Sequence, residues 1–229
     1  MNESINRRYF LKQTGAAGIG LGVAGYLGSL ASLRAQTGSA PAKKIGANDI
    51  ITAAVIGTNG RGLAHVGCLT SLPGVEITHI CDVDPRAIQK GIKETLKKQA
   101  NAPQGEGDFR KILADKSIDV VTIATPDHWH TPMAILAMAA GKHVYVEKPC
   151  SQNPYEGELL LQAVNKYQRV VQMGAQRRSS PAMLDIIPQI RNGLIGKTYF
   201  AKGWYANARA SIGHGKPAPV PEWLDYELW

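Results

Sequence analysis

The sequence predicts an α/β protein built on a doubly wound sheet of parallel strands. Residues 50–56 and 75–82 are two runs rich in β-branched apolar residues, which are typical of strands buried on both faces of a parallel sheet. A glycine-rich turn at residues 57–62 joins the first run to a helical stretch that extends to Leu72. This strand–turn–helix–strand order is that of a Rossmann domain, which we expect at residues 49–175.

The glycine-rich turn predicts a binding site for the phosphates of a dinucleotide. Gly57 allows a tight turn and Gly62 allows close packing of helix on strand, while the free N–H groups of the first helical turn attract a pyrophosphate. Asn59 stands where the pattern has its middle glycine; asparagine tolerates a left-handed backbone but leaves the phosphates less room. An ordinary α/β turn without a ligand is the alternative for this stretch. The cofactor-binding candidates here are Gly57, Thr58, Asn59, Gly60, Arg61 and Gly62.

An acid at the end of the second predicted strand indicates the kind of dinucleotide. Asp82 lies 20 residues after Gly62, where a carboxylate can accept hydrogen bonds from the adenosine ribose. A carboxylate also repels a 2′-phosphate, so the sequence favours NAD over NADP. Arg86 is the nearby residue that can compensate, which leaves NADP possible.

The rest of the domain alternates helices and strands. The expected elements are an amphipathic helix at 85–99, a polar loop at 101–107, a short helix around 109–113, a strand at 119–124, a buried helix capped by Thr131 and closed by Gly141, a strand at 143–146, a helix that begins at Asn153, and a strand at 170–174.

The loop after the strand at 119–124 is expected to face the nicotinamide, because ligands of doubly wound sheets sit beyond the carboxyl ends of the strands. Its candidate contacts are Thr125, Pro126, Trp129 and His130. Capping or packing at the next helix is the alternative for His130. His128 and His130 have a spacing that can bind a metal, but no further ligand is evident, so we predict no metal site.

Glu147 and Lys148 stand at the end of the strand at 143–146, just before Pro149. An ammonium beside substrate hydroxyls can orient the substrate and modulate a proton relay, since the pKa of a buried lysine is readily lowered. The alternative for a Glu-Lys pair is a surface ion pair. The place of this pair at the sheet edge that binds ligands favours a functional role.

Composition argues against a nucleic-acid partner. The formal charge of the 229 residues is +8, of which +3 falls in residues 1–35, and the other basic residues are scattered as on a solvated face. The three cysteines have no metal-binding spacing, so we expect buried small residues.

The N-terminus resembles an export signal. Arg7 and Arg8, followed by an aromatic residue and then Leu-Lys, precede a mildly apolar stretch rich in glycine and alanine, as in a twin-arginine signal peptide. We expect this signal at residues 1–35 and a flexible linker at 36–48. The twin-arginine translocation machinery is then a partner and the periplasm a destination. A membrane anchor is the alternative, and an uncleaved leader would tether the protein. Because this route carries folded proteins, a dinucleotide would be loaded before export and stay tightly bound.

Four features in order resemble the Gfo/Idh/MocA family, the relatives of glucose-fructose oxidoreductase and inositol dehydrogenase. They are the glycine turn, the acid ending the second strand, Thr-Pro-x-x-x-His at 125–130, and Ala-Gly-Lys-His-Val-Tyr-Val-Glu-Lys-Pro at 140–149. The resemblance implies that residues 57–62 and Asp82 hold the adenosine and pyrophosphate, and that residues 125–130 hold the nicotinamide ribose. It places Glu147 and Lys148 at the nicotinamide, with Lys148 catalytic, and it places Gln176 and Arg177 near cofactor and substrate.

Residues 176–229 are expected to begin the family's α+β substrate domain. A helix opens at Ser180-Pro181, with a kink expected at Pro188, and a strand is expected at 197–205. Family members supply an Asp-x-x-x-His acid–base pair later in this domain. No such pair follows Lys148, so we read the chain as an incomplete one in which Trp204, Trp223 and Trp229 lack packing partners. The full-length protein is expected to be a homo-oligomer.

These observations favour an exported NAD(P)-dependent oxidoreductase that moves hydride between a tightly bound nicotinamide cofactor and a secondary alcohol of a sugar, cyclitol or glycoside. An NAD-dependent glycosidase of the same superfamily is one alternative. A nucleotide-binding module without turnover is another.

Overall fold

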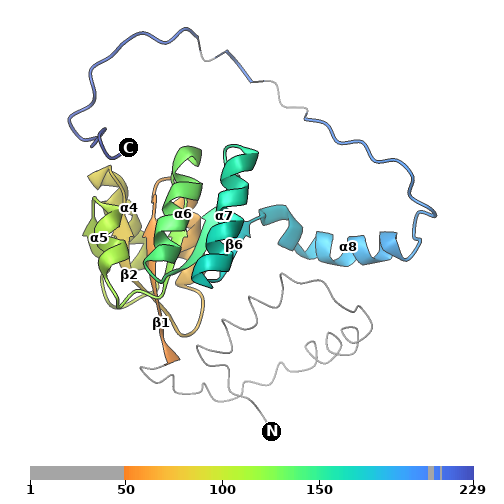
Figure 1. The fold of residues 1–229 in the computed structure, drawn as a ribbon, viewed down its shortest axis with the longest axis horizontal. Coiled ribbons are helices and arrows are strands. Elements are labelled where there is room, and N and C mark those ends of the chain that lie inside the picture. The colour runs from red at the N-terminus through yellow and green to blue at the C-terminus, as the bar shows by residue number, and fades with distance from the viewer. Residues whose placement is uncertain (1–48, 206–208, 212) are drawn as a thin grey trace.

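The computed structural model of the chain describes residues 49–205, 209–211 and 213–229 (Figure 1). The expected signal peptide and linker at residues 1–48 lie outside the described residues. Within the described residues, no helix combines the length and the hydropathy that crossing a bilayer requires.

The sheet has six parallel strands in the order β3-β2-β1-β4-β5-β6. The strands are β1 (Ile51–Ile56), β2 (Val75–Cys81), β3 (Gln104–Glu106), β4 (Val120–Ile123), β5 (His143–Glu147) and β6 (Val171–Gly174). This order reverses direction between β1 and β4, which leaves a crevice beyond their carboxyl ends. The predicted doubly wound Rossmann fold is confirmed.

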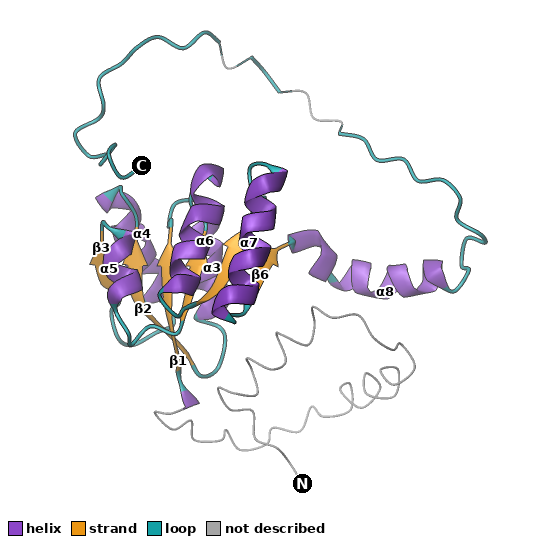
Figure 2. Cartoon of the chain, in the orientation of Figure 1, coloured by secondary structure: helices purple, strands orange, loops and turns teal. Residues whose placement is uncertain are grey.

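Helices cover both faces of the sheet (Figure 2). The helices are α3 (Arg61–Leu69), α4 (Pro85–Thr95), α5 (Phe109–Ala114), α6 (His130–Ala139), α7 (Pro154–Tyr167) and α8 (Pro181–Arg191), with short 3-10 turns η2 (Asp127–Trp129) and η3 (Gln176–Ser179). Buried residues of α5, α6 and α7 form one core with the sheet, and those of α3 and α4 form the other.

Strand β1 shows why its sequence is almost continuously apolar. Ala54 and Ile56 pack into the core under α5, α6 and α7, whereas Val55 between them packs into the core under α3 and α4. A strand covered on both faces has no side left for polar residues. The central position of β1 therefore follows from its composition.

Helix starts follow the expected capping chemistry. Asp84, Asp108 and Asn153 precede α4, α5 and α7, and the side chain of each accepts a hydrogen bond from a backbone N–H of the first turn, at 2.9 Å in every case. Pro85 and Pro154 occupy the first turns of α4 and α7. Each cap satisfies a donor that the helix itself cannot.

Two local expectations were wrong. The polar loop expected at 101–107 contains the edge strand β3, which pairs with His79–Cys81 of β2. Its three residues carry no apolar pattern, so only the pairing partner reveals it. Thr131 does not cap α6, because the helix already begins at His130 and the Thr131 hydroxyl donates to the carbonyl oxygen of Cys150 at 2.6 Å.

The strand expected at 197–205 is also wrong. These residues are irregular and exposed in the structure, with Tyr199 94% exposed. A strand needs a neighbour to satisfy its backbone, and none of the described residues pairs with this stretch. The helix expected after Ser180 is confirmed as α8, with Pro188 inside it. The C-terminal residues 221–229 lie beside the α4 end of the sheet, where the backbone N–H of Asp225 donates to the carbonyl oxygen of Val83 (Figure 1).

Candidate functional site

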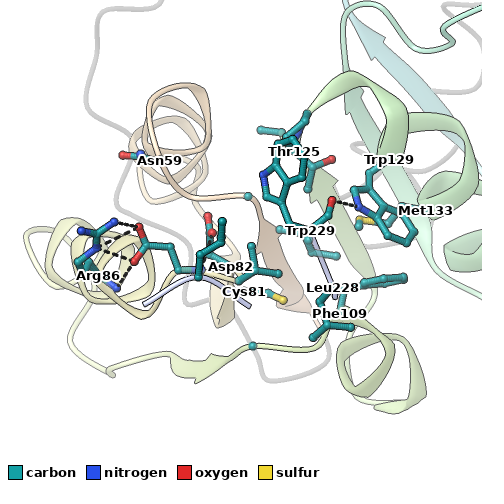
Figure 3. Close-up of a pocket in the computed structure, with 18 of the residues that line it drawn as sticks. Asn59, Cys81, Asp82, Arg86, Phe109, Thr125, Trp129, Met133, Leu228 and Trp229 are labelled. Carbon is teal, nitrogen blue, oxygen red and sulfur yellow. Dashed lines mark hydrogen bonds and ion pairs between the residues drawn. The ribbon is translucent and has the colours of Figure 1, made fainter. Parts of the chain in front are cut away.

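A cavity of about 440 Å³ lies at the carboxyl ends of the strands, where the sheet order reverses (Figure 3). It is the place at which doubly wound sheets bind ligands. Seven of the predicted cofactor residues line it: Gly57, Asn59, Asp82, Arg86, Thr125, Pro126 and Trp129.

The glycine turn packs too closely for side chains at two positions. Gly57 has φ +81°, and a Cβ there would lie 2.7 Å from the backbone of Ala124 and Thr125. A Cβ on Gly62 would lie 1.8 Å from the carbonyl oxygen of Gly57. The two glycines therefore let α3 approach β1 and β4, as the sequence predicts.

The outer side of the same turn is open. Gly60 precedes α3 with φ +60°, and a Cβ there would meet no atom within 4 Å. No side chain of the described residues caps α3, so the N–H groups of its first turn are available to an anion, and that turn contains no acid. The turn forms with Asn59 outside the left-handed region, and the ammonium of Lys90 donates to the Asn59 amide oxygen at 3.3 Å. These features fit a pyrophosphate.

Asp82 ties the end of β2 to the glycine turn. Its Oδ2 accepts a hydrogen bond from the backbone N–H of Thr58 at 2.7 Å, and its Oδ1 accepts one from that of Asp84 at 3.1 Å. Thr58 is fully buried, so it holds the loop from inside and presents no side chain to the cavity. Asp82 still lines the cavity. Its Oδ2 also accepts a hydrogen bond from the Thr58 hydroxyl at 3.4 Å, so the further lone pair available to a ribose is on Oδ1.

Arg86 lies at the same end of the cavity, and its guanidinium already has two partners within the protein. Its Nη2 lies 2.7 Å from Oδ2 of Asp84, and its guanidinium stacks 3.5 Å from the ring centroid of Trp223. The hydrogen bonds from Arg86 lower the pKa of Asp84, so the pair stays ionised. The guanidinium that can compensate for a 2′-phosphate is thus held in place by a carboxylate and an indole.

His130 corrects one expectation. It is buried, with Nδ1 2.6 Å from the carbonyl oxygen of Pro149 and Nε2 2.9 Å from that of Thr125. The ring therefore bridges the loops after β4 and β5 and does not line the cavity among its described residues. The packing alternative describes His130, and the prediction of a direct cofactor contact was wrong. Both ring nitrogens of His130 lie within hydrogen-bond distance of carbonyl oxygens, so this ring offers no free nitrogen to a metal as arranged here.

Glu147 is the centre of a polar cluster that the sequence did not predict. Its side chain is 4% exposed, and Oε1 lies 2.7 Å from Nε of Arg61 and 3.1 Å from Nε2 of His65. Gln176 donates from its amide to Oε2 at 3.0 Å. Three predicted cofactor residues, Arg61, Glu147 and Gln176, are thus brought together with one another and do not line the cavity. They connect α3, β5 and η3.

His65 is the member that sequence reasoning missed. It lies four residues after Arg61, so both side chains project from one face of α3. That spacing is the signal in the sequence, but an isolated histidine on a helix is uninformative until a partner is known. The His65 ring also meets the Tyr145 ring edge-on, with centroids 5.2 Å apart.

Glu147 and His65 differ in their charge state at neutral pH. Burial alone would raise the pKa of Glu147, but hydrogen bonds from Arg61, His65 and Gln176 outweigh it and hold that pKa at about 2. Burial lowers the pKa of His65, and the adjacent Glu147 offsets this only in part. At neutral pH, Glu147 is therefore an anion paired with Arg61, and His65 is a neutral donor.

We expect Glu147→Gln to lower the free energy of unfolding by about 2 kcal/mol, because it weakens hydrogen bonds to a buried charge. That corresponds to a fall in Tm of roughly 4–8 °C for a chain of this size. Differential scanning calorimetry measures it. Glu158→Gln, at an exposed position on α7, is the matched control and should change stability by less than about 0.5 kcal/mol. Equal Tm values for the two variants would contradict the role of the cluster.

Glu147→Gln should also change how the free energy of unfolding depends on pH in the acid range. A carboxyl whose pKa is lowered on folding stabilises fully above its ordinary pKa of 4.5, and this stabilisation is lost as the pH falls toward 2. The wild-type chain should lose stability over that window more steeply than Glu147→Gln. Urea denaturation at pH values through the window gives both slopes, and parallel curves would contradict the assignment.

Lys148 and Arg177 lie outside the cavity. Both are exposed in the structure, Lys148 just after β5 and Arg177 in η3. The backbone N–H of Lys148 donates to Oε2 of Glu147 at 3.2 Å, so the cluster fixes the backbone that carries the lysine. The catalytic role of Lys148 and the substrate contact of Arg177 stay predictions.

Comparison with known proteins agrees with this geometry. The model of the Gfo/Idh/MocA oxidoreductase family, described as an NAD-binding Rossmann fold, matches residues 51–175. The glycosyl hydrolase family 109 protein of Saccharopolyspora erythraea is 30% identical over 226 residues, covering 95% of this chain and 49% of that protein. The alpha-N-acetylgalactosaminidase of Shewanella oneidensis is 30% identical over 211 residues, covering 88% of this chain and 46% of that protein.

Among solved structures, that of GenD2 from gentamicin A biosynthesis, in complex with NAD, superposes with a TM-score of 0.53 and 26% identity. The match covers 58% of this chain and 36% of GenD2. The chain spans about half the length of the curated relatives it matches.

Proposed function

The chain belongs to the Gfo/Idh/MocA family of oxidoreductases, and we propose that the protein oxidises or reduces a secondary alcohol of a sugar, cyclitol or glycoside. Its residues 51–175 are an NAD-binding Rossmann domain. The observation that carries the proposal is the cavity where the strand order reverses, lined by Gly57, Asn59, Asp82 and Thr125. We further propose export by the twin-arginine route, which the Arg7-Arg8 pattern supports.

The residues of the chain have distinct parts in this reaction. The first turn of α3 and the glycine turn bind the pyrophosphate, and Asp82 accepts hydrogen bonds from the adenosine ribose. His130 keeps the loops after β4 and β5 at a fixed separation, which positions Thr125 and Pro126. NAD supplies the acceptor for the hydride that leaves the alcohol carbon.

Lys148 is the residue we propose for transfer of the proton from the substrate hydroxyl. As hydride leaves the carbon, the hydroxyl proton must pass to a base, and an amine beside the substrate can orient that hydroxyl and relay its proton. The exposed position of Lys148 at the end of β5 leaves it accessible to a substrate, and Glu147 fixes the backbone beneath it. Because an exported cofactor cannot exchange readily, the cycle is proposed to oxidise one substrate and reduce another on the same bound NAD.

A glycosidase is the second candidate, favoured by the names of the two curated relatives. In that reaction oxidation of a ring hydroxyl to a ketone would acidify the neighbouring C–H, and loss of that proton would expel the aglycone and leave an enone. Water would then add to the enone, and the hydride taken up in the first step would return to reduce the ketone. Both candidates therefore need the same cavity and the same hydride transfer. They differ in whether a glycosidic bond breaks.

The full-length protein provides the test. Denaturing the purified protein should release NAD, and turnover with a panel of glycosides should give a keto sugar, detected by mass spectrometry. Release of aglycone without net redox change would replace the oxidoreductase with the glycosidase. Bound NAD without either product would support a nucleotide-binding module without turnover. Failure to bind any dinucleotide would contradict all three.

A further inference from the structure

We propose that residues 221–229 form the outer wall of the dinucleotide site, so that Trp223 and Trp229 contact the bound cofactor. This inference rests on the proposed NAD site. It assigns binding residues to a segment that is remote in sequence from the glycine turn and that shows no phosphate-binding pattern of its own.

The segment is anchored at both sides of the crevice. The backbone N–H of Asp225 donates to the carbonyl oxygen of Val83, just after β2, at 3.3 Å. A main-chain oxygen of Trp229 accepts hydrogen bonds from Nε2 of His128 at 2.8 Å and from Nε1 of Trp129 at 2.7 Å, in the loop after β4. Residues 225–229 therefore reach from the acid end of the cavity to the loop expected at the nicotinamide (Figure 3).

Its side chains face the cavity with aromatic and apolar surface. Trp223, Leu224, Leu228 and Trp229 all line it. The Trp223 ring packs on the guanidinium of Arg86, and the Trp229 ring meets His128 edge-on with centroids 5.3 Å apart. Trp223 and Trp229 are still 41% and 46% exposed, so each indole has surface available to a ligand.

The segment encloses the cavity and does not fill it. The volume of about 440 Å³ remains with the segment in place, and Gly57, Asn59, Asp82 and Thr125 still open onto it. Planar heterocycles are the ligands that indoles bind best, by stacking. Because Trp223 packs on Arg86, it is assigned to the adenine end. Trp229, which lies by Thr125 and Trp129 (Figure 3), is assigned to the nicotinamide end.

The test measures how fast NADH leaves the full chain. The protein is loaded with NADH and chased with excess NAD, and the decay of bound NADH fluorescence gives the release rate. Trp223→Ala and Trp229→Ala should each speed release about tenfold, the loss expected for one stacking ring. Trp204→Ala is the matched control, because Trp204 is 77% exposed and does not line the cavity; its release rate should equal that of the wild type. Thermal unfolding of each variant checks the fold, and Trp223→Phe should restore most of the slow release.

Three outcomes separate the possibilities. An unchanged release rate in both alanine variants would contradict the proposal that residues 221–229 contact the cofactor, but it would not contradict the NAD site itself. Slower release or tighter binding in those variants would show that the segment competes with the cofactor, which also overturns the proposal. A wild-type chain that binds no NADH would contradict the proposed function itself.

Discussion

Replacing Gly62 by alanine is expected to weaken NAD binding about 100-fold, which is roughly 2.7 kcal/mol. The new Cβ would lie 1.8 Å from the carbonyl oxygen of Gly57. No side-chain rotation relieves an overlap between a Cβ and a backbone atom, so α3 must move away from the turn. The N–H groups at the start of α3 then no longer point at the pyrophosphate. Isothermal titration with NAD, after removal of any bound cofactor, measures the change.

Gly67→Ala is the matched control. Gly67 lies on the same helix, and a Cβ there would meet no atom within 4 Å. Because alanine favours the helix over glycine, this variant should keep NAD affinity and gain roughly 0.5–1 kcal/mol of stability. Gly62→Ala should instead lose roughly 1–3 kcal/mol through overpacking. Wild-type NAD affinity in Gly62→Ala would rule out the turn as the phosphate site.

Replacing Lys148 by alanine is expected to reduce turnover by roughly 10²–10⁴-fold, the usual contribution of one proton-transfer group. The measurement is the rate of keto-sugar formation by the full-length protein on the best substrate of the glycoside panel. NAD release should change little, because Lys148 does not line the cavity among the described residues. A fall in kcat with bound NAD retained would therefore separate a chemical role from a binding role.

Two further variants make the lysine test specific. Lys93→Ala removes another exposed ammonium, from α4, and should leave turnover unchanged. Lys148→Arg keeps the charge but holds a group that does not deprotonate, so it should be nearly as impaired as Lys148→Ala if a proton is moved. Full activity in Lys148→Ala would remove the lysine from the mechanism.

The signals that the sequence carried reliably are local ones. The run 50–56 is apolar at almost every position because β1 is buried on both faces, and that composition alone predicts a central parallel strand. Gly57 and Gly62 can also be predicted from the sequence, because a turn this tight admits only glycine at those two positions. Seven of the predicted cofactor residues do line the cavity.

Other assignments failed or shifted because they depend on partners remote in sequence. Strand β3 has no apolar pattern and exists through its pairing with β2. The stretch at 197–205 alternates like a strand but has no pairing partner among the described residues. The sequence treated Trp223 and Trp229 as lacking partners, whereas Trp223 packs on Arg86 and Trp229 is hydrogen-bonded to the loop after β4.

By itself, then, the sequence determined the doubly wound sheet, the phosphate turn and the acid at the end of β2, because each follows from the backbone and burial needs of neighbouring residues. Only the tertiary structure decided that Glu147 gathers Arg61, His65 and Gln176, that His130 bridges two loops, and that residues 221–229 line the cavity. Those roles depend on which atoms meet across long separations in the chain. No local pattern encodes such a meeting, since the same glutamate, histidine or tryptophan is equally at home on a solvated surface.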